Sequence, residues 1–284
     1  MIIQQRQFRP PRTMRSLNSY AVLVLVTCLI GLPLVWFLIT SLKQEIEYLA
    51  YPISVLPKEP QWENYANALT LIPFYKYAWN SLFLALSFSV LTVITSAMSG
   101  FGFSRFQAPG RDALFTIVIA LLMIPSIVTV IPQFIVFSRL HLTNTYWPWI
   151  LWGLAASPFH IFLFRQFFAS IPRELEDAAE VDGCSPFRIF WQIFLPNAKP
   201  ALATSFLFNF VGVWGDYFTP LIFLSDEKTT LAVKLVRAYT DPQGHVLITT
   251  TLAACVIYTL PLVILFFLGQ KYLTRGVVTS GLKG

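Results

Sequence analysis

The sequence contains few charged residues for its length. Only 12% of its 284 residues are Asp, Glu, Lys or Arg, whereas an ordinary soluble domain has roughly 25%. Hydrophobic residues make up 56% of the chain, and a soluble protein of this composition would expose large apolar patches to water. We therefore expect an integral membrane protein. The net charge of +6 comes without a basic stripe, so nucleic acid is not an expected partner.

The sequence also lacks the residue patterns of a catalytic or metal-binding protein. Its three cysteines, Cys28, Cys184 and Cys255, are scattered and form no Cys-x-x-Cys pair, so neither a disulfide framework nor a metal site is predicted. No G-x-x-x-x-G-K-[ST] loop is present to hold the phosphates of ATP. We predict no catalytic residue, no metal and no cofactor bound by this chain.

Apolar stretches long enough to cross a bilayer recur along the chain. A transmembrane helix needs about 20 mostly apolar residues, and each backbone amide in lipid needs a partner within the protein. We predict an all-α bundle in a membrane domain of residues 20–272, preceded by a cytoplasmic segment 1–19 and followed by a cytoplasmic tail 273–284. Its six transmembrane helices are expected at about residues 20–40, 78–101, 113–136, 146–166, 200–224 and 248–270.

Four arginines near the N-terminus, Arg6, Arg9, Arg12 and Arg15, precede a long apolar stretch. This stretch, from Ser16 to Leu42, has no charged residue. A cleavable signal peptide would have an apolar region of about 7–15 residues before a small-residue cleavage site, so we interpret the stretch as an uncleaved first span. With the N-terminus in the cytoplasm, 13 of the 20 Lys and Arg residues fall in cytoplasmic segments, which favours both termini inside.

Two spans carry residues that are unusual in a membrane helix. Pro125 and Pro132 are expected to kink the third span, either for packing or for gating. Asp216 lies in the fifth span, where a carboxylate costs roughly 2.5–3.5 kcal/mol, and it is flanked by Trp214 and Tyr217. Aromatic rings beside a carboxylate suit a polyol, so these three are candidates for a translocation path. Pairing with another subunit and an interfacial position are the alternatives for Asp216.

The stretch between the fourth and fifth spans, residues 170–198, has the signals of two short helices. Pro172 suits the first position of a helix, and acidic residues follow it where the helix dipole favours them. Gly183 suits the left-handed residue that follows a helix. Ser185 and Pro186 then begin a second helix, which Pro196 is expected to end before the fifth span.

The first of these helices has the pattern of a docking element. Leu175, Ala178 and Ala179 share one face at helical spacing, and small side chains permit close approach. Such a helix suits a groove on a soluble partner. A solvated amphipathic loop is the alternative.

Seven residues of this segment match a family motif. Asp177-Ala178-Ala179, Gly183, Ile193, Leu195 and Pro196 have the spacing of the EAA motif of binding-protein-dependent importer permeases, with Asp in place of Glu. The chain thus resembles the ABC transporter permeases of the carbohydrate, maltose-transporter-like family. Weaker likenesses are found at Thr40–Lys43, Trp79–Leu82, Phe103–Arg105, Leu142–Thr145 and Gly281–Gly284.

The resemblance implies a type I importer permease fold in a bacterial inner membrane. Such a subunit pairs with a second permease, two ATP-binding subunits that carry ATP and Mg²⁺, and an extracytoplasmic solute-binding protein. It is not an enzyme, and it forms half of the path for a sugar or sugar-like solute. The residues that would couple it to an ATPase are Arg173, Glu174, Leu175, Glu176, Asp177, Ala178, Ala179, Asp182, Gly183, Ile193, Leu195 and Pro196.

Three other functions compete with a sugar importer. The same architecture could carry a non-sugar solute such as an amino acid, peptide or osmolyte. An ion-coupled secondary transporter uses buried carboxylates and broken helices, and here only Asp216 and the prolines of the third span favour it. A membrane anchor or assembly protein is the third alternative, although the sequence offers no soluble domain.

Overall fold

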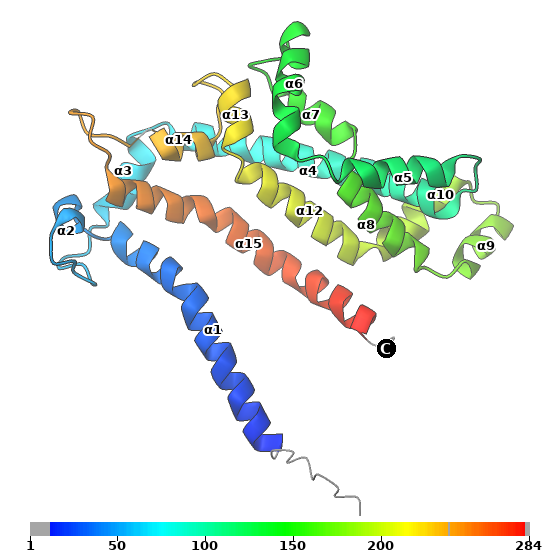
Figure 1. Ribbon diagram of the computed structural model, residues 1–284, viewed down its shortest axis with the longest axis horizontal. Coiled ribbons are helices and arrows are strands. Elements are labelled where there is room, and N and C mark those ends of the chain that lie inside the picture. The colour runs from blue at the N-terminus through cyan, green and yellow to red at the C-terminus, as the bar shows by residue number, and fades with distance from the viewer. Residues whose placement is uncertain (1–11, 238, 282–284) are drawn as a thin grey trace, which may run out of the picture. The chain divides into compact units, whose positions relative to one another are not determined.

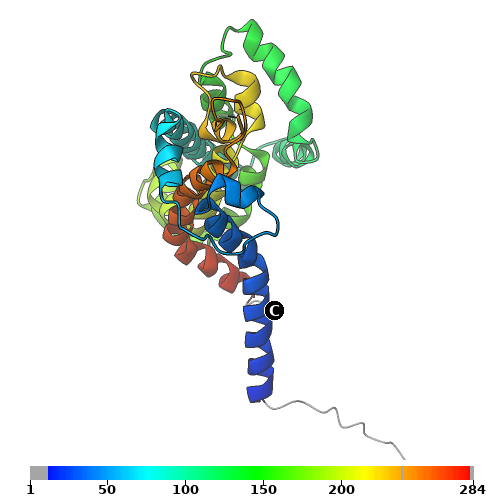
Figure 2. The same cartoon turned by 90° about the vertical axis from the view of Figure 1, so that its left-hand side faces the viewer.

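The computed structural model describes residues 12–237 and 239–281 (Figures 1 and 2), and these residues form helices without a β-strand. The helices are α1 (Arg12–Ser41), α2 (Glu45–Leu49), α3 (Glu63–Thr70), α4 (Phe74–Arg105), α5 (Arg111–Leu121), α6 (Ser126–Arg139), α7 (Trp147–Leu154), α8 (Pro158–Ala169), α9 (Glu174–Val181), α10 (Pro186–Ile189), the π-helix η1 (Phe190–Phe194), α11 (Leu195–Asn197), α12 (Lys199–Trp214), α13 (Phe218–Phe223), α14 (Leu231–Arg237) and α15 (Ile248–Gly281).

Four helical stretches among the described residues are long and apolar enough to cross a membrane. They are Ser19–Ser41, Phe74–Arg105, Trp147–Ala169 and Ile248–Tyr272. The pair α5 and α6 makes a fifth if it is counted as one span, although the two helices meet at 99°, an angle that is plain in Figure 2. The predicted all-α membrane fold is therefore confirmed, and the count of six spans is not.

Three of the breaks in the predicted spans precede a proline. A proline ring clashes with the carbonyl four residues earlier. Helix α5 ends at Leu121, four residues before Pro125, and α7 ends at Leu154, four residues before Pro158. The predicted kink of the third span is confirmed at Pro125. The other expected kink site, Pro132, lies inside the helix α6.

The predicted fifth span, 200–224, is not one helix. Helix α12 ends at Trp214, and α13 begins at Phe218. Asp216 thus lies in a break rather than inside a helix, which corrects the sequence interpretation. The physical reason is Pro220, whose ring would meet the Asp216 carbonyl in a continuous helix. Instead, a carboxylate oxygen of Asp216 accepts the Thr219 N–H at 3.0 Å and caps the second piece.

The described residues fall into two compact units. The smaller one holds the chain up to Thr70 and the segment Tyr239–Ile257. In it the Glu45 carboxylate accepts the Ile248 N–H at 2.9 Å and the Thr249 N–H at 3.0 Å, so it satisfies the open N-terminus of α15. The buried Tyr239 hydroxyl donates to the Ala68 carbonyl at 2.6 Å, and burial raises the pKa of Tyr239.

The larger unit holds the chain from Leu71 to the residue before Tyr239, and again from Tyr258 onward. Its central helix α4 packs along α7, α8 and α12, as Figure 1 shows. The contact with α8 is close, because a Cβ on Gly100 would lie 2.6 Å from the Phe164 Cβ. At the opposite end of α4, Asn80 and Ser81 bond the backbone of Thr229 and Leu231 at 3.0 and 2.8 Å.

The predicted terminal segments are described only in part. Of the cytoplasmic segment predicted for 1–19, residues 1–11 lie outside the described residues, and α1 begins at Arg12. Of the tail predicted for 273–284, the backbone is helical as far as Gly281, and the last three residues lie outside the described residues.

Candidate functional site

Residues 170–198 form two short helical pieces that meet at a glycine, as the sequence predicts. At the end of α9 the Cys184 N–H donates to the Ala179 carbonyl and the Gly183 N–H donates to the Glu180 carbonyl, both at 2.9 Å. This pair of bonds is the Schellman motif, which places its glycine in the left-handed region. Gly183 has φ +77°, so the prediction for this residue is confirmed.

The second piece begins at the predicted residues. The Ser185 hydroxyl accepts the Arg188 N–H at 3.4 Å, and Pro186 occupies the first turn of α10. The helix then widens into η1, where the Leu195 N–H donates to the Phe190 carbonyl five residues earlier. Phe190 and Phe194 of this piece are buried in a cluster with Phe101 and Phe168, whereas Phe187 and Trp191 are exposed.

Two predicted helix boundaries in this segment are wrong. Pro172 is not the first residue of α9, because the helix begins at Glu174. The Arg173 carbonyl accepts the N–H groups of Glu176 and Asp177. Pro196 does not end the second helix. It lies in the first turn of α11, directly after η1. Proline is tolerated in the first turn of a helix because the N–H that it lacks would have no intrahelical partner there.

Only one side of α9 faces the protein. Ala179 is 6% exposed and packs in an aromatic cluster with Phe168 and Phe190, whereas Leu175 is 47% exposed. Leu175, Ala178 and Ala179 therefore do not form one open surface, because the aromatic cluster covers Ala179 and leaves the other two exposed. The predicted coupling residues that are exposed are Arg173, Glu174, Leu175, Asp177, Ala178, Asp182, Gly183 and Pro196. Glu176, Ile193 and Leu195 are half-buried.

One buried cation beneath α9 was not singled out by sequence reasoning. The Arg105 side chain is 3% exposed, and it makes an ion pair of 3.3 Å with the Glu176 carboxylate. The same guanidinium donates to the carbonyls of Phe168 and Ile171, the latter at 2.6 Å, and lies 4.6 Å from the Phe194 ring centre. Its place at the end of a long apolar helix was the available signal in the sequence.

The three candidate path residues are not equivalent. Trp214 is 3% exposed and stacks between Phe210 and Tyr258, with ring centres 5.6 and 5.2 Å away. Its indole N–H donates to the Tyr258 carbonyl at 3.1 Å. Asp216 and Tyr217 are half-buried in the break that follows. Trp214 therefore supports the break from inside the bundle, and the other two side chains reach the surface of the chain.

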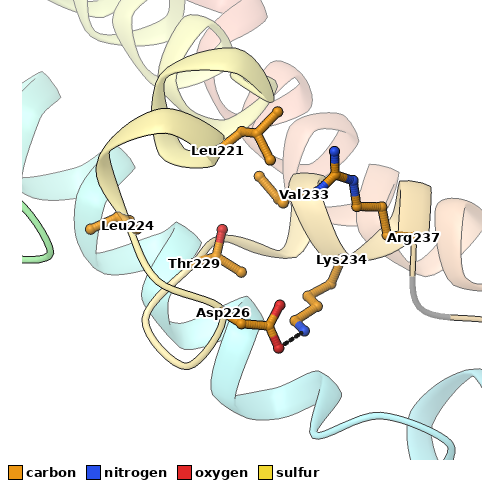
Figure 3. Close-up of a pocket in the computed structure, with 7 residues that line it drawn as sticks. All are labelled: Leu221, Leu224, Asp226, Thr229, Val233, Lys234 and Arg237. Carbon is orange, nitrogen blue, oxygen red and sulfur yellow. Dashed lines mark hydrogen bonds and ion pairs between the residues drawn. The ribbon is translucent and has the colours of Figure 1, made fainter. Parts of the chain in front are cut away.

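A small cavity lies between α13 and α14. It has a volume of about 180 Å³ and is lined by Leu221, Leu224, Asp226, Thr229, Val233, Lys234 and Arg237. Two of these lining residues form an ion pair, in which the Lys234 ammonium lies 2.5 Å from the Asp226 carboxylate, as Figure 3 shows. Sequence reasoning did not identify this cavity, because its residues come from two short helices and the loop between them, which carry no motif.

Residues 92–279 match the family described as the binding-protein-dependent transport system inner membrane component. The chain belongs to this family. It is accordingly a permease component of an importer and a multi-pass protein of the inner membrane. The matched residues include the segment 170–198.

Curated relatives of this permease extend over most of its length. The diacetylchitobiose uptake permease NgcG of Streptomyces coelicolor is 32% identical over 93% of this chain and 87% of the relative. The lactose permease LacG of Rhizobium radiobacter is 32% identical over 95% and 97%. The sn-glycerol-3-phosphate permease UgpE of Brucella abortus is 30% identical over 95% and 98%.

A solved structure shares the fold of this permease. A chain of a bacterial ABC transporter involved in the import of the acidic polysaccharide alginate superposes with a TM-score of 0.80. It is 22% identical and covers 94% of this chain and 99% of that chain. The likeness shows that the permease has an ABC importer fold.

Proposed function

We propose that this permease is one of two membrane subunits of an ATP-driven importer, and that its solute is an oligosaccharide or a similar polyol. The observation that supports this solute class is sequence identity of 30% or more, over nearly the whole chain, to permeases named for diacetylchitobiose, lactose, arabinooligosaccharides and glycerol phosphate. All four solutes carry at least two hydroxyl groups. No feature of the described residues favours an amino acid or peptide instead.

The proposed topology has six spans with both termini in the cytoplasm. The bent pair α5 and α6 forms the third span, and α12 with α13 forms the fifth, interrupted at Asp216. The 99° angle between α5 and α6 and the polar break after Trp214 both interrupt a helix within a span. A membrane protein tolerates such irregular backbone only where it lines a cavity or contacts protein. The Lys and Arg distribution supports the orientation.

The segment of residues 170–198, with α9 at its exposed end, is the proposed contact with the ATPase. Its first turn carries the exposed acidic residues Glu174 and Asp177, and Leu175 and Val181 expose 47% and 89% of their surface beside them. Glu176 faces inward to Arg105 and is not part of this surface. An exposed helix with apolar and acidic side chains suits a groove on a soluble subunit. ATP and Mg²⁺ would be held by that subunit, which hydrolyses the ATP.

The break between α12 and α13 is the proposed contact with the solute. Asp216 uses one carboxylate oxygen to cap α13, which leaves its second oxygen for a hydroxyl group. Tyr217 offers a ring for the C–H face of a sugar. The buried Trp214 stack holds this break against α15 through Tyr258.

The test is reconstitution of the whole transporter. We would co-express the chain with the second permease, the ATPase and the solute-binding protein encoded beside it, and place the purified complex in lipid. We expect ATP hydrolysis to rise only when the binding protein is loaded with one solute of a panel of disaccharides, oligosaccharides and glycerol phosphate. Stimulation by an amino acid or peptide alone would contradict the sugar assignment.

A further inference from the structure

We propose that Arg105 is the residue that makes α9 move together with α4 and α8. The inference rests on the proposed function, because it concerns how a displacement of α9 by the ATPase reaches the membrane helices. Arg105 is not part of the surface offered to another subunit, since its side chain is 3% exposed. It acts through Glu176 and is therefore a positioning residue.

Arg105 joins the ends of two long helices. It is the last residue of α4, and its guanidinium donates to the Phe168 carbonyl in the last turn of α8 and to the Ile171 carbonyl just beyond it. The last carbonyls of a helix have no partner within it and carry a partial negative charge. A buried cation that donates to one of them, and to the Ile171 carbonyl just beyond the helix, ties α4 to α8 at this end.

The same two helices are already in close contact one turn earlier. A Cβ on Gly100 would lie 2.6 Å from the Phe164 Cβ and 2.9 Å from the Arg165 nitrogen. Backbones that approach so closely move as a pair, because well-packed interiors transmit displacement. The helices α4 and α8 therefore move as one rigid pair, and Arg105 lies at the end of this pair.

Few contacts attach α9 to the pair α4 and α8. Ala179 is the one residue of α9 that is buried, and Glu176, three positions earlier, lies on the same face of the helix. The Glu176 carboxylate makes the 3.3 Å ion pair with Arg105, and its side chain is 16% exposed. An alanine methyl resists being pushed inward but does not resist sliding or being pulled outward. The directional ion pair supplies that resistance.

A fourth element converges on the same guanidinium. The Phe194 ring of η1 lies 4.6 Å below it, and that ring packs edge-on against Phe101 and Phe168 at 4.9 and 5.7 Å. Arg105 thus contacts α8, α9 and η1 from the end of α4. Movement of the exposed α9 would be shared among these elements through one side chain.

The experiment measures solute imported per ATP hydrolysed by the complete transporter in liposomes. Glu176→Gln keeps the shape of the side chain and leaves the contacts of Arg105 with α8 in place, so the complex should assemble normally. We expect its ratio of import to hydrolysis to fall about fivefold or more, the lower end of common coupling effects. Arg105→Lys, which keeps the charge but not the fork of donors, should lower the ratio as well.

Arg111→Gln is the matched control. Arg111 is the first residue of α5, six positions after Arg105, and it donates to the Phe106 carbonyl at 3.1 Å and pairs with Asp112 at 2.9 Å. The bonds found for it stay within the loop and α5. The control should keep the wild-type ratio. A role confined to stability would lower import and hydrolysis together in proportion to the amount of assembled complex, and the ratio would not change.

The outcomes separate the two proposals. If the wild-type complex shows no solute-stimulated hydrolysis, the proposed function fails before Arg105 is tested. If the wild type transports, an unchanged ratio in both Glu176→Gln and Arg105→Lys overturns the inference. An equal fall in Arg111→Gln overturns it too, because the effect would then belong to any arginine of this loop.

Discussion

Two glycines of α4 differ in what surrounds them, although they are only two residues apart. A Cβ on Gly100 would lie 2.6 Å from the Phe164 Cβ, whereas a Cβ on Gly102 would meet nothing within 4 Å. We expect Gly100→Ala to lower the free energy of unfolding by about 1–3 kcal/mol through overpacking of α4 on α8.

Gly102→Ala is the control for Gly100→Ala. It should keep or slightly raise stability, because alanine is favoured over glycine in a helix by about 1 kcal/mol. Thermal unfolding of the two purified variants in the same detergent compares them directly. Equal unfolding temperatures would contradict the close approach of α4 and α8.

The backbone conformation at position 183, and not a lack of space, favours glycine there. Its φ is +77°, yet a Cβ there would meet nothing within 4 Å. Gly183→Val should strain the turn by about 1–2 kcal/mol, displace α9 and lower solute uptake more than ATP hydrolysis. Gly183→Asn should retain most uptake, because asparagine tolerates the left-handed region. Equal uptake in the Val variant and the wild type would contradict a coupling role for this turn.

Asp216 has a structural role and a proposed solute role that one substitution separates. Asp216→Asn keeps an oxygen to accept the Thr219 N–H and removes the charge, whereas Asp216→Ala removes both. We expect Asn to raise the solute concentration for half-maximal uptake with little effect on stability. Ala should also cost about 1 kcal/mol of stability through the lost cap. Unaltered uptake kinetics in the Asn variant would remove Asp216 from the solute path.

At the scale of helices, the sequence predicts where apolar stretches lie better than how they break. The first, second and last predicted spans correspond to α1, α4 and α15, although a proline lies inside two of these helices. Pro125, Pro158 and Pro220 break helices, whereas Pro33, Pro132 and Pro261 lie inside them. A proline breaks a helix where neighbours stabilise another backbone path, such as the Asp216 cap, and that depends on tertiary contacts.

In the candidate site, too, the sequence predicts local features but not those that depend on tertiary contacts. The Schellman turn at Gly183 and the cap at Ser185 are local features, and the sequence predicts both correctly. The inward direction of Glu176 and Ala179 is set by contacts with residues about 70 positions earlier or on η1. Nothing in the local pattern of α9 distinguishes its buried alanine from Ala178, so the sequence alone could not divide the motif into inner and outer residues.

At the scale of the whole chain, the orientation in the membrane is a prediction that labelling can test. Single cysteines at exposed positions, Ala178→Cys in α9 and Val236→Cys in α14, would be introduced with the natural cysteines replaced. A membrane-impermeant thiol reagent should label position 236 in intact spheroplasts and position 178 only after the membrane is opened. The reverse pattern would contradict cytoplasmic termini.

The most direct test of the central claim is solute-stimulated ATP hydrolysis by the purified complex in lipid, with this chain carrying the affinity tag. We expect an ATPase and a second permease to be recovered with it, and one sugar-loaded binding protein to raise hydrolysis above the unloaded level. Recovery of the chain without an ATPase, together with uptake driven by an ion gradient, would contradict an ATP-driven importer and favour a secondary transporter.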